Sequence, residues 1–182
     1  MNLISRLIVR ALYRFSGRLP CRLIPLPSGP YLERYYLGFW RGQHRYLHRF
    51  VANDAERHLH DHPWRAASSW VLTGWYIEEA GSLIGRTILG GTRKVRWFNR
   101  LRRSTHSRDL HRITEIRPET WTLFSHTSWD YPWGFYDAAD TWPLRHVTAY
   151  HQFKPAPYDP AGSQWWLTAP PGRYADREPL RI

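Results

Sequence analysis

The chain has 182 residues and a formal net charge of +11, and 42% of its residues are hydrophobic. This length suits one domain with a substantial core. The single cysteine, Cys21, excludes an internal disulfide and a zinc site built from several thiolates. No apolar run approaches about 18 residues, so we expect no membrane span. The N-terminus lacks the clean apolar block of a secretory signal, so we expect a cytoplasmic protein.

The positive charge is almost entirely arginine, since Lys94 and Lys154 are the only lysines. Guanidinium groups make forked contacts with carboxylates and phosphates, so one interpretation is an anionic partner: nucleic acid, acidic lipid or an anionic substrate. The other interpretation is a genome that encodes arginine in preference to lysine. The basic residues are spread along the chain and are not gathered around an aromatic recognition motif.

Residues 2–16 are predicted to form a basic amphipathic helix. The apolar stripe at helical spacing is Ile4, Leu7, Ile8, Ala11, Leu12 and Phe15. The arginines that recur every four residues on another side are Arg6, Arg10, Arg14 and Arg18. This stripe either covers one end of the domain or binds a membrane surface or nucleic acid. Prolines and glycines then indicate a connector, so residues 1–29 are assigned to the helix and connector.

Residues 30–154 read as short strands separated by turn residues. The expected strands are 31–37, 45–51, 57–62, 68–79, 95–98, 110–116, 120–125 and 145–153. Gly74 inside one of them is typical of a bulge or a close backbone approach, and the basic stretch 99–108 is expected to be a loop. This pattern predicts an all-β sandwich or barrel. The Pro- and Gly-rich tail, residues 155–182, is expected to wrap the surface or to be partly disordered.

Three histidines alternate in Arg57-His58-Leu59-His60-Asp61-His62-Pro63-Trp64. Alternate residues of a strand share a face, and neutral imidazole is a common ligand of transition metals. Positions i and i+4 lie about 13 Å apart, so we expect two of the three to bind one ion. The best candidate for a third ligand is His111, 49 residues after His62 on a later strand. The alternative is a solvent-facing strand edge with chance histidines.

Over roughly residues 31–153 the sequence resembles the cupin superfamily of antiparallel β-barrels, or jelly rolls, and looks most like cupin-like proteins of bacteria and phages. The resemblance rests on Tyr31-Leu32-Glu33-Arg34-Tyr35-Tyr36, Leu59-His60-Asp61-His62-Pro63-Trp64, Gly74-Trp75-Tyr76, Asp109-Leu110-His111-Arg112-Ile113, Trp121-Thr122-Leu123-Phe124 and Trp133-Gly134-Phe135. It implies a cupin-like β-barrel that follows an N-terminal helix, and, by analogy with cupins that pair through barrel edges, a homodimer.

The resemblance also implies a metal site made by His60, His62 and His111. The glutamate usual in this motif falls at Ala66 or Ala67, and the Pro-x-Gly before the last histidine is replaced within residues 106–108. The missing glutamate suggests a three-histidine site like that of the thiol dioxygenases of this superfamily. Three ligands leave coordination positions open, as in catalytic sites. Fe(II) is the expected divalent ion, with Zn(II) or Ni(II) as alternatives.

Five further residues are candidates for the pocket or for contacts to the ligands. His58 is a second choice as ligand, and Asp61 is expected to point away from its histidine neighbours into a turn or a supporting hydrogen bond. Trp64 is either a core residue or a pocket wall. Arg112 should face away from His111, which makes it a weak anchor for a substrate carboxylate. His126 lines the cavity or lies at the surface.

Three functions remain open. The first is a metal-dependent cupin enzyme, an Fe(II) oxygenase or hydroxylase that acts on a small molecule. The second is a metal-dependent sugar isomerase or epimerase, which needs a base near the metal, with Glu115 and His126 as candidates. The third is a non-catalytic Arg-rich module that binds nucleic acid or an anionic membrane, with an affinity that falls as salt rises.

Overall fold

The computed structural model describes residues 2–26, 29–53, 58–84, 87–96, 100–101, 109–128, 133–138, 147–155 and 164–182. Its helices are α1 (Leu3–Ser16) and the short 3-10 helices η2 (Trp165–Leu167) and η3 (Gly172–Tyr174). Its strands are β1 (Cys21–Leu26), β2 (Gly29–Trp40), β3 (Gln43–Phe50), β4 (Leu59–His60), β5 (Ala67–Thr73), β6 (Trp75–Ile84), β7 (Thr87–Arg96), β8 (Arg100–Leu101), β9 (Asp109–Ile116), β10 (Thr120–His126), β11 (Gly134–Ala138) and β12 (Val147–Pro155).

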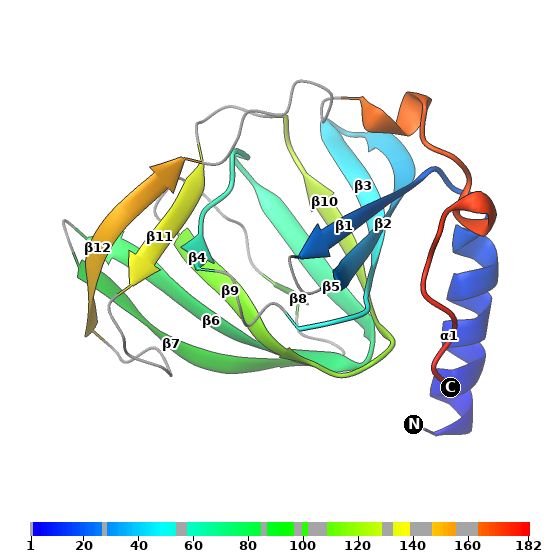
Figure 1. Ribbon diagram of the computed structural model, residues 1–182, viewed down its shortest axis with the longest axis horizontal. Helices are drawn as coiled ribbons and strands as arrows, with labels where there is room; N and C mark the ends of the chain where they lie inside the picture. The colour runs from blue at the N-terminus through cyan, green and yellow to red at the C-terminus, as the bar shows by residue number, and fades with distance from the viewer. Residues whose placement is uncertain are drawn as a thin grey trace.

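Two antiparallel sheets face each other, as Figure 1 shows. The first is open, with the strand order β1-β2-β3-β10-β5-β8, and the second closes on itself in the order β11-β12-β7-β6-β9-β4. The chain therefore has the expected fold, an all-β, cupin-like antiparallel β-barrel of the jelly-roll type with an N-terminal amphipathic helix. No helix in the described ranges is long and apolar enough to cross a membrane.

The hydrophobic core has two parts, one on each face of the first sheet. Between the sheets, buried side chains of β2, β3 and β5 pack against those of β6, β7 and β9, including Phe50, Val71 and Tyr76. On the outer face, Val9 of α1 packs with Tyr35 and Trp121. Helix α1 and the C-terminal segment lie side by side along this outer face (Figure 1).

A buried ion-pair network joins the C-terminal segment to the first sheet. Arg49 pairs with Glu33 at 3.0 Å and with Glu119 at 2.6 Å, and all three side chains are at most 2% exposed. The same guanidinium group also donates to the carbonyl oxygens of Glu178 at 2.5 Å and Pro179 at 2.8 Å. All three guanidinium nitrogens are thus paired, as burial of a charge requires.

Residues 21–26 form a strand, whereas the sequence predicted a connector there. β1 is an edge strand, and it pairs with β2 from Cys21↔Tyr35 to Leu26↔Gly29. An edge strand tolerates proline because one side of its backbone needs no partner, and the register shift between Ile24 and Pro25 accommodates the ring. The prolines that suggested a connector therefore belong to an edge strand of the sheet and not to a loop.

Several other expected elements differ in extent. The expected run 68–79 is divided at Gly74 into β5 and β6, and the expected histidine strand contributes only β4 to a sheet. Within the expected loop 99–108, residues 100–101 form β8, and the rest lies outside the described residues. In the C-terminal tail, residues 164–182 are described. Arg177 joins this segment to α1 through the Tyr13 carbonyl, and an antiparallel bridge joins Pro171 to Pro20, which follows the helix.

Candidate metal centre

Three histidines from two parts of the closed sheet converge on one point. His60 in β4 pairs directly with His111 in β9, and His62 follows two residues after His60. One nitrogen from each ring lies within 4.8 Å of the others, and the Nε2 atoms of His62 and His111 are 2.7 Å apart. Three imidazoles with converging nitrogens and no thiolate suit a divalent transition metal.

Asp61 holds the short strand β4 in place. Its carboxylate accepts the backbone N–H of Gly134 at 2.7 Å and the hydroxyl of Tyr136 at 3.2 Å. Its own backbone N–H donates to the Gly134 carbonyl at 3.3 Å. Burial raises the pKa of Asp61, and these hydrogen bonds oppose the rise. Asp61 thus faces away from the cluster and fixes the backbone between His60 and His62 against β11.

Glu78 orients His111. The Nδ1 atom of His111 lies 2.6 Å from a Glu78 carboxylate oxygen, and Arg93 contacts the other oxygen at 2.6 Å. Burial alone would raise the pKa of Glu78, but the hydrogen bond from His111 and the neighbouring charge and hydrogen bond of Arg93 lower it overall. An ionised carboxylate only accepts, so His111 donates its Nδ1 proton and directs its Nε2 lone pair to the cluster.

Glu78 was missed by the sequence analysis. In a β-strand, Glu78 and Glu79 must face opposite sides, so one of the two was bound to point into the barrel. Which one does so depends on the phase of β6. That phase is set after Gly74, where the chain has a φ of +75°.

Burial keeps His62 neutral. Desolvation, and then the neighbouring rings of His111 and His60, lowers the pKa of His62 well below its usual range. A metal ligand must present an unprotonated nitrogen. The site is therefore ready to bind a cation without first releasing a proton from His62.

Aromatic rings enclose the cluster on two sides. Trp64 stacks on His62 with ring centroids 4.4 Å apart, and Trp133 and Phe135 lie within 6.4 Å of His60. Trp64 is 6% exposed, so it is both a core residue and a wall of the cluster. The sequence did not indicate a role for Trp133 or Phe135, because both lie far along the chain from the histidines that they contact.

His126 lies behind Trp64 and does not reach the cluster. Its ring stacks on the ring of Trp64, and the two ring centroids lie 4.3 Å apart. Burial lowers the pKa of His126 to about 3, although its hydrogen bond to the Thr127 carbonyl opposes this. His126 is therefore a neutral core residue and not a base beside the proposed metal.

The remaining candidates lie outside the cluster. His58 is exposed, and it is not among the three residues that converge. Arg112 contacts the buried carboxylate of Glu79 at 2.8 Å, on the opposite face of β9 from His111. Glu115 is exposed because the pairing of β9 with β6 shifts register between Ile77 and Glu78. Neither base considered for an isomerase lies at the cluster.

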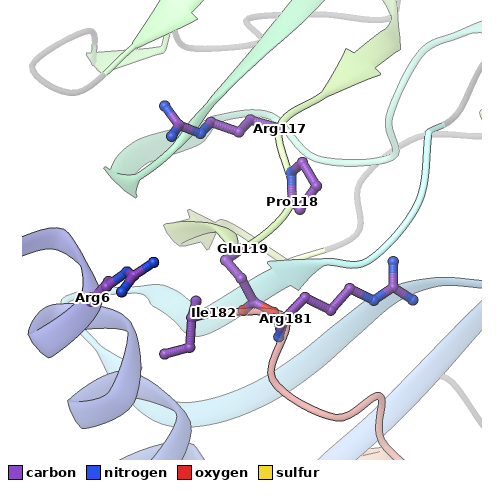
Figure 2. Close-up of a pocket in the computed structure, with 6 residues that line it drawn as sticks. All are labelled: Arg6, Arg117, Pro118, Glu119, Arg181 and Ile182. Carbon is purple, nitrogen blue, oxygen red and sulfur yellow. Dashed lines mark hydrogen bonds between the residues drawn. The ribbon is translucent and has the colours of Figure 1, made fainter. Parts of the chain in front are cut away.

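A pocket of about 260 Å³ lies elsewhere on the molecule. It is lined by Arg6, Arg117, Pro118, Glu119, Arg181 and Ile182. Figure 2 shows the guanidinium group of Arg181 directed away from those of Arg6 and Arg117. The lining contains no imidazole, and its one acidic side chain, Glu119, is already paired with Arg49, so we place the candidate chemistry at the histidine cluster.

Protein-family models and curated protein sequences give no match to this chain. Similar solved structures include Fe(II)-HppE with the alternative substrate (S)-1-HPP, at 8% identity over 62% of this chain and 57% of that chain, with a TM-score of 0.45. Oxalate oxidase in complex with glycolate has 17% identity, covers 52% and 46%, and has a TM-score of 0.39.

Streptomyces albus HEPD with 2-hydroxyethylphosphonate and Fe(II) has 12% identity, covers 61% and 24%, and has a TM-score of 0.37. This chain therefore spans from about a quarter to somewhat over half of the length of these proteins. The assignment of the fold rests on the strand pairing described above.

Proposed function

We propose that this chain is a metal-dependent enzyme in which His60, His62 and His111 hold one divalent ion. The observation that carries the proposal is the convergence of three imidazole nitrogens within 4.8 Å. Its main support is the Glu78 carboxylate, which orients the His111 ring. In metal sites, carboxylates commonly hydrogen-bond to a ligating histidine in this way. A lone cluster of surface histidines would have neither the buried carboxylate nor the aromatic enclosure.

We infer further that the ion is Fe(II) and that the reaction is the oxidation of a small molecule. An ion held by three imidazoles keeps open positions, where it can bind substrate and supply redox or Lewis-acid chemistry. Trp64 beside His62, and Trp133 and Phe135 beside His60, cover two sides of the cluster with apolar surface. In the described part of the chain, the two candidate bases for an isomerase lie away from these histidines, which favours oxidation over proton abstraction.

The test uses protein reconstituted anaerobically with Fe(II) and then exposed to nitric oxide, which stands in for O₂. Iron with an open position should give the S = 3/2 electron paramagnetic resonance signal of an iron–nitrosyl centre, and His111→Ala should lose the signal. His58→Ala is the matched control, and it should keep it. Protein that holds Fe(II) but gives no signal would contradict an oxygenase.

A further inference from the structure

Helix α1 exposes a continuous apolar face that the rest of the described chain does not cover. The exposed fractions are 73% for Leu3, 68% for Ile4, 55% for Leu7, 37% for Ile8 and 48% for Phe15. These side chains recur at helical spacing and so share one side of α1. This finding corrects the interpretation that the stripe covers one end of the domain, because Leu12 alone among the large stripe residues packs against the core.

The opposite side of α1 anchors the helix to the protein. Val9 and Ser16 are fully buried, and Leu12 and Tyr13 pack against the outer face of the first sheet. Arg177 of the C-terminal segment donates to the Tyr13 carbonyl at 3.0 Å, and its guanidinium carbon lies 3.6 Å from the centre of the Tyr13 ring. One face of the helix is thus fixed to the protein, and the apolar face described above remains exposed.

The charges of α1 are of one sign. Residues 3–16 contain Arg6, Arg10 and Arg14 and no acidic residue. Within the described ranges, none of the ion pairs involves these three arginines. Their spacing of four residues places them along one flank of the exposed apolar face. The helix therefore offers an apolar surface bordered by guanidinium groups that are free to meet an anion.

We propose that α1 docks this protein on an anionic membrane surface. In this arrangement the helix lies in the plane of the interface, with the apolar face among the acyl chains and the arginines at the lipid phosphates. A second copy of the chain fits less well, because pairing two such helices brings arginines together with no acidic residue between them. Nucleic acid would use the arginines but would leave the apolar face in water.

The apolar half of the proposal is tested by flotation with vesicles of 30% phosphatidylglycerol in phosphatidylcholine. We expect the full chain to float with these vesicles and to stay behind with pure phosphatidylcholine. Leu7→Glu should weaken binding roughly 10-fold or more, because it places a charge where apolar surface is buried. Leu167→Glu is the matched control, since Leu167 is 70% exposed on η2, and it should float like the unaltered chain.

The electrostatic half compares two double variants that remove the same charge. Arg10→Gln with Arg14→Gln should weaken vesicle binding roughly 30-fold, at about 1 kcal/mol for each arginine near an anionic surface. Arg41→Gln with Arg96→Gln, two exposed positions outside α1, should weaken it much less. Equal losses in both double variants, or equal binding to neutral vesicles, would overturn the proposal.

Two further outcomes would replace the membrane with another occupant. A dimer in sedimentation velocity that Leu7→Glu abolishes, without vesicle binding, would assign the face to a second copy. Binding to a DNA duplex that needs the arginines but is unaffected by Leu7→Glu, again without vesicle binding, would assign the helix to nucleic acid.

Discussion

The candidate site depends on single side chains that supply different properties. His60, His62 and His111 supply the nitrogens, Glu78 sets the orientation of one ring, and Asp61 fixes the backbone between the first two. The identity of the three histidines followed from their spacing and from the cupin resemblance. The supporting hydrogen bond of Asp61 was one of its two expected roles. The role of Glu78 was not predicted, because Glu78 contacts His111 from a neighbouring strand and not along the chain.

At this scale Glu78→Gln is the most informative change. The amide keeps the shape of the side chain but removes the charge that holds the Nδ1 proton of His111, so metal affinity should fall roughly 10- to 100-fold. The control is Glu79→Gln, which alters the neighbouring buried carboxylate on the opposite face. We expect it to lower stability but to leave metal affinity within about 3-fold of the unaltered chain in a competitive titration. Equal affinity losses in both variants would contradict the orienting role.

Among the elements, the junction between β5 and β6 sets the phase of the strand that carries Glu78. Gly74 turns the chain with a φ of +75°, and a β carbon there would lie 2.2 Å from the Thr120 hydroxyl oxygen. That hydroxyl also bridges the Trp75 backbone and the Arg117 carbonyl. Of the two roles that its place in the sequence suggested, Gly74 therefore serves the close backbone approach, and it does so at a bend between β5 and β6.

Gly74→Ala should lower the free energy of unfolding by about 3 kcal/mol, because backbone strain and overpacking add. Gly42→Ala is the matched control, since Gly42 has a φ of +74° with nothing within 4 Å of the added carbon. It should cost about 1 kcal/mol from backbone strain alone. Urea unfolding measures both, and similar costs would show that contact with Thr120 is unimportant.

The sequence predicted elements well where hydrophobic alternation was strong, as in β3, β9 and β10. It did worse where tertiary contacts decide. β1 was not predicted because its prolines are tolerated only at the edge of the sheet, and the sequence does not show which strand lies there. β11 is short and pairs with β4 and β12. The stripe of α1 showed that a helix forms, but spacing alone does not tell which face the protein covers.

For the whole molecule, the interior between the sheets holds several neutral histidines. His48, His62 and His126 all have pKa values lowered chiefly by burial. The unfolded chain takes up protons on these residues below about pH 6.5, whereas the folded chain does not. Their contribution to stability is thus complete above that pH and is lost as the pH falls, for His126 down to about pH 3.

We expect His126→Phe to flatten this pH dependence. Between about pH 6 and pH 5 each such histidine adds up to about 1.4 kcal/mol per pH unit to the slope of unfolding free energy. Phenylalanine keeps the stack on Trp64 but removes one titrating group, so the slope should fall by about that amount. Urea titrations of the metal-free chain measure it, with His58→Phe as an exposed control. An unchanged slope in His126→Phe would show that its ring is not held neutral by burial.

The most direct measurement is the metal content of the untagged protein, by elemental analysis, beside His60→Ala, His111→Ala and the control His58→Ala. We expect about one divalent ion per chain, iron by our proposal, in the unaltered protein and in the control, and almost none in the two cluster variants. A full complement of metal in His60→Ala and His111→Ala, or no metal in any form after anaerobic reconstitution, would contradict a metal centre at this cluster.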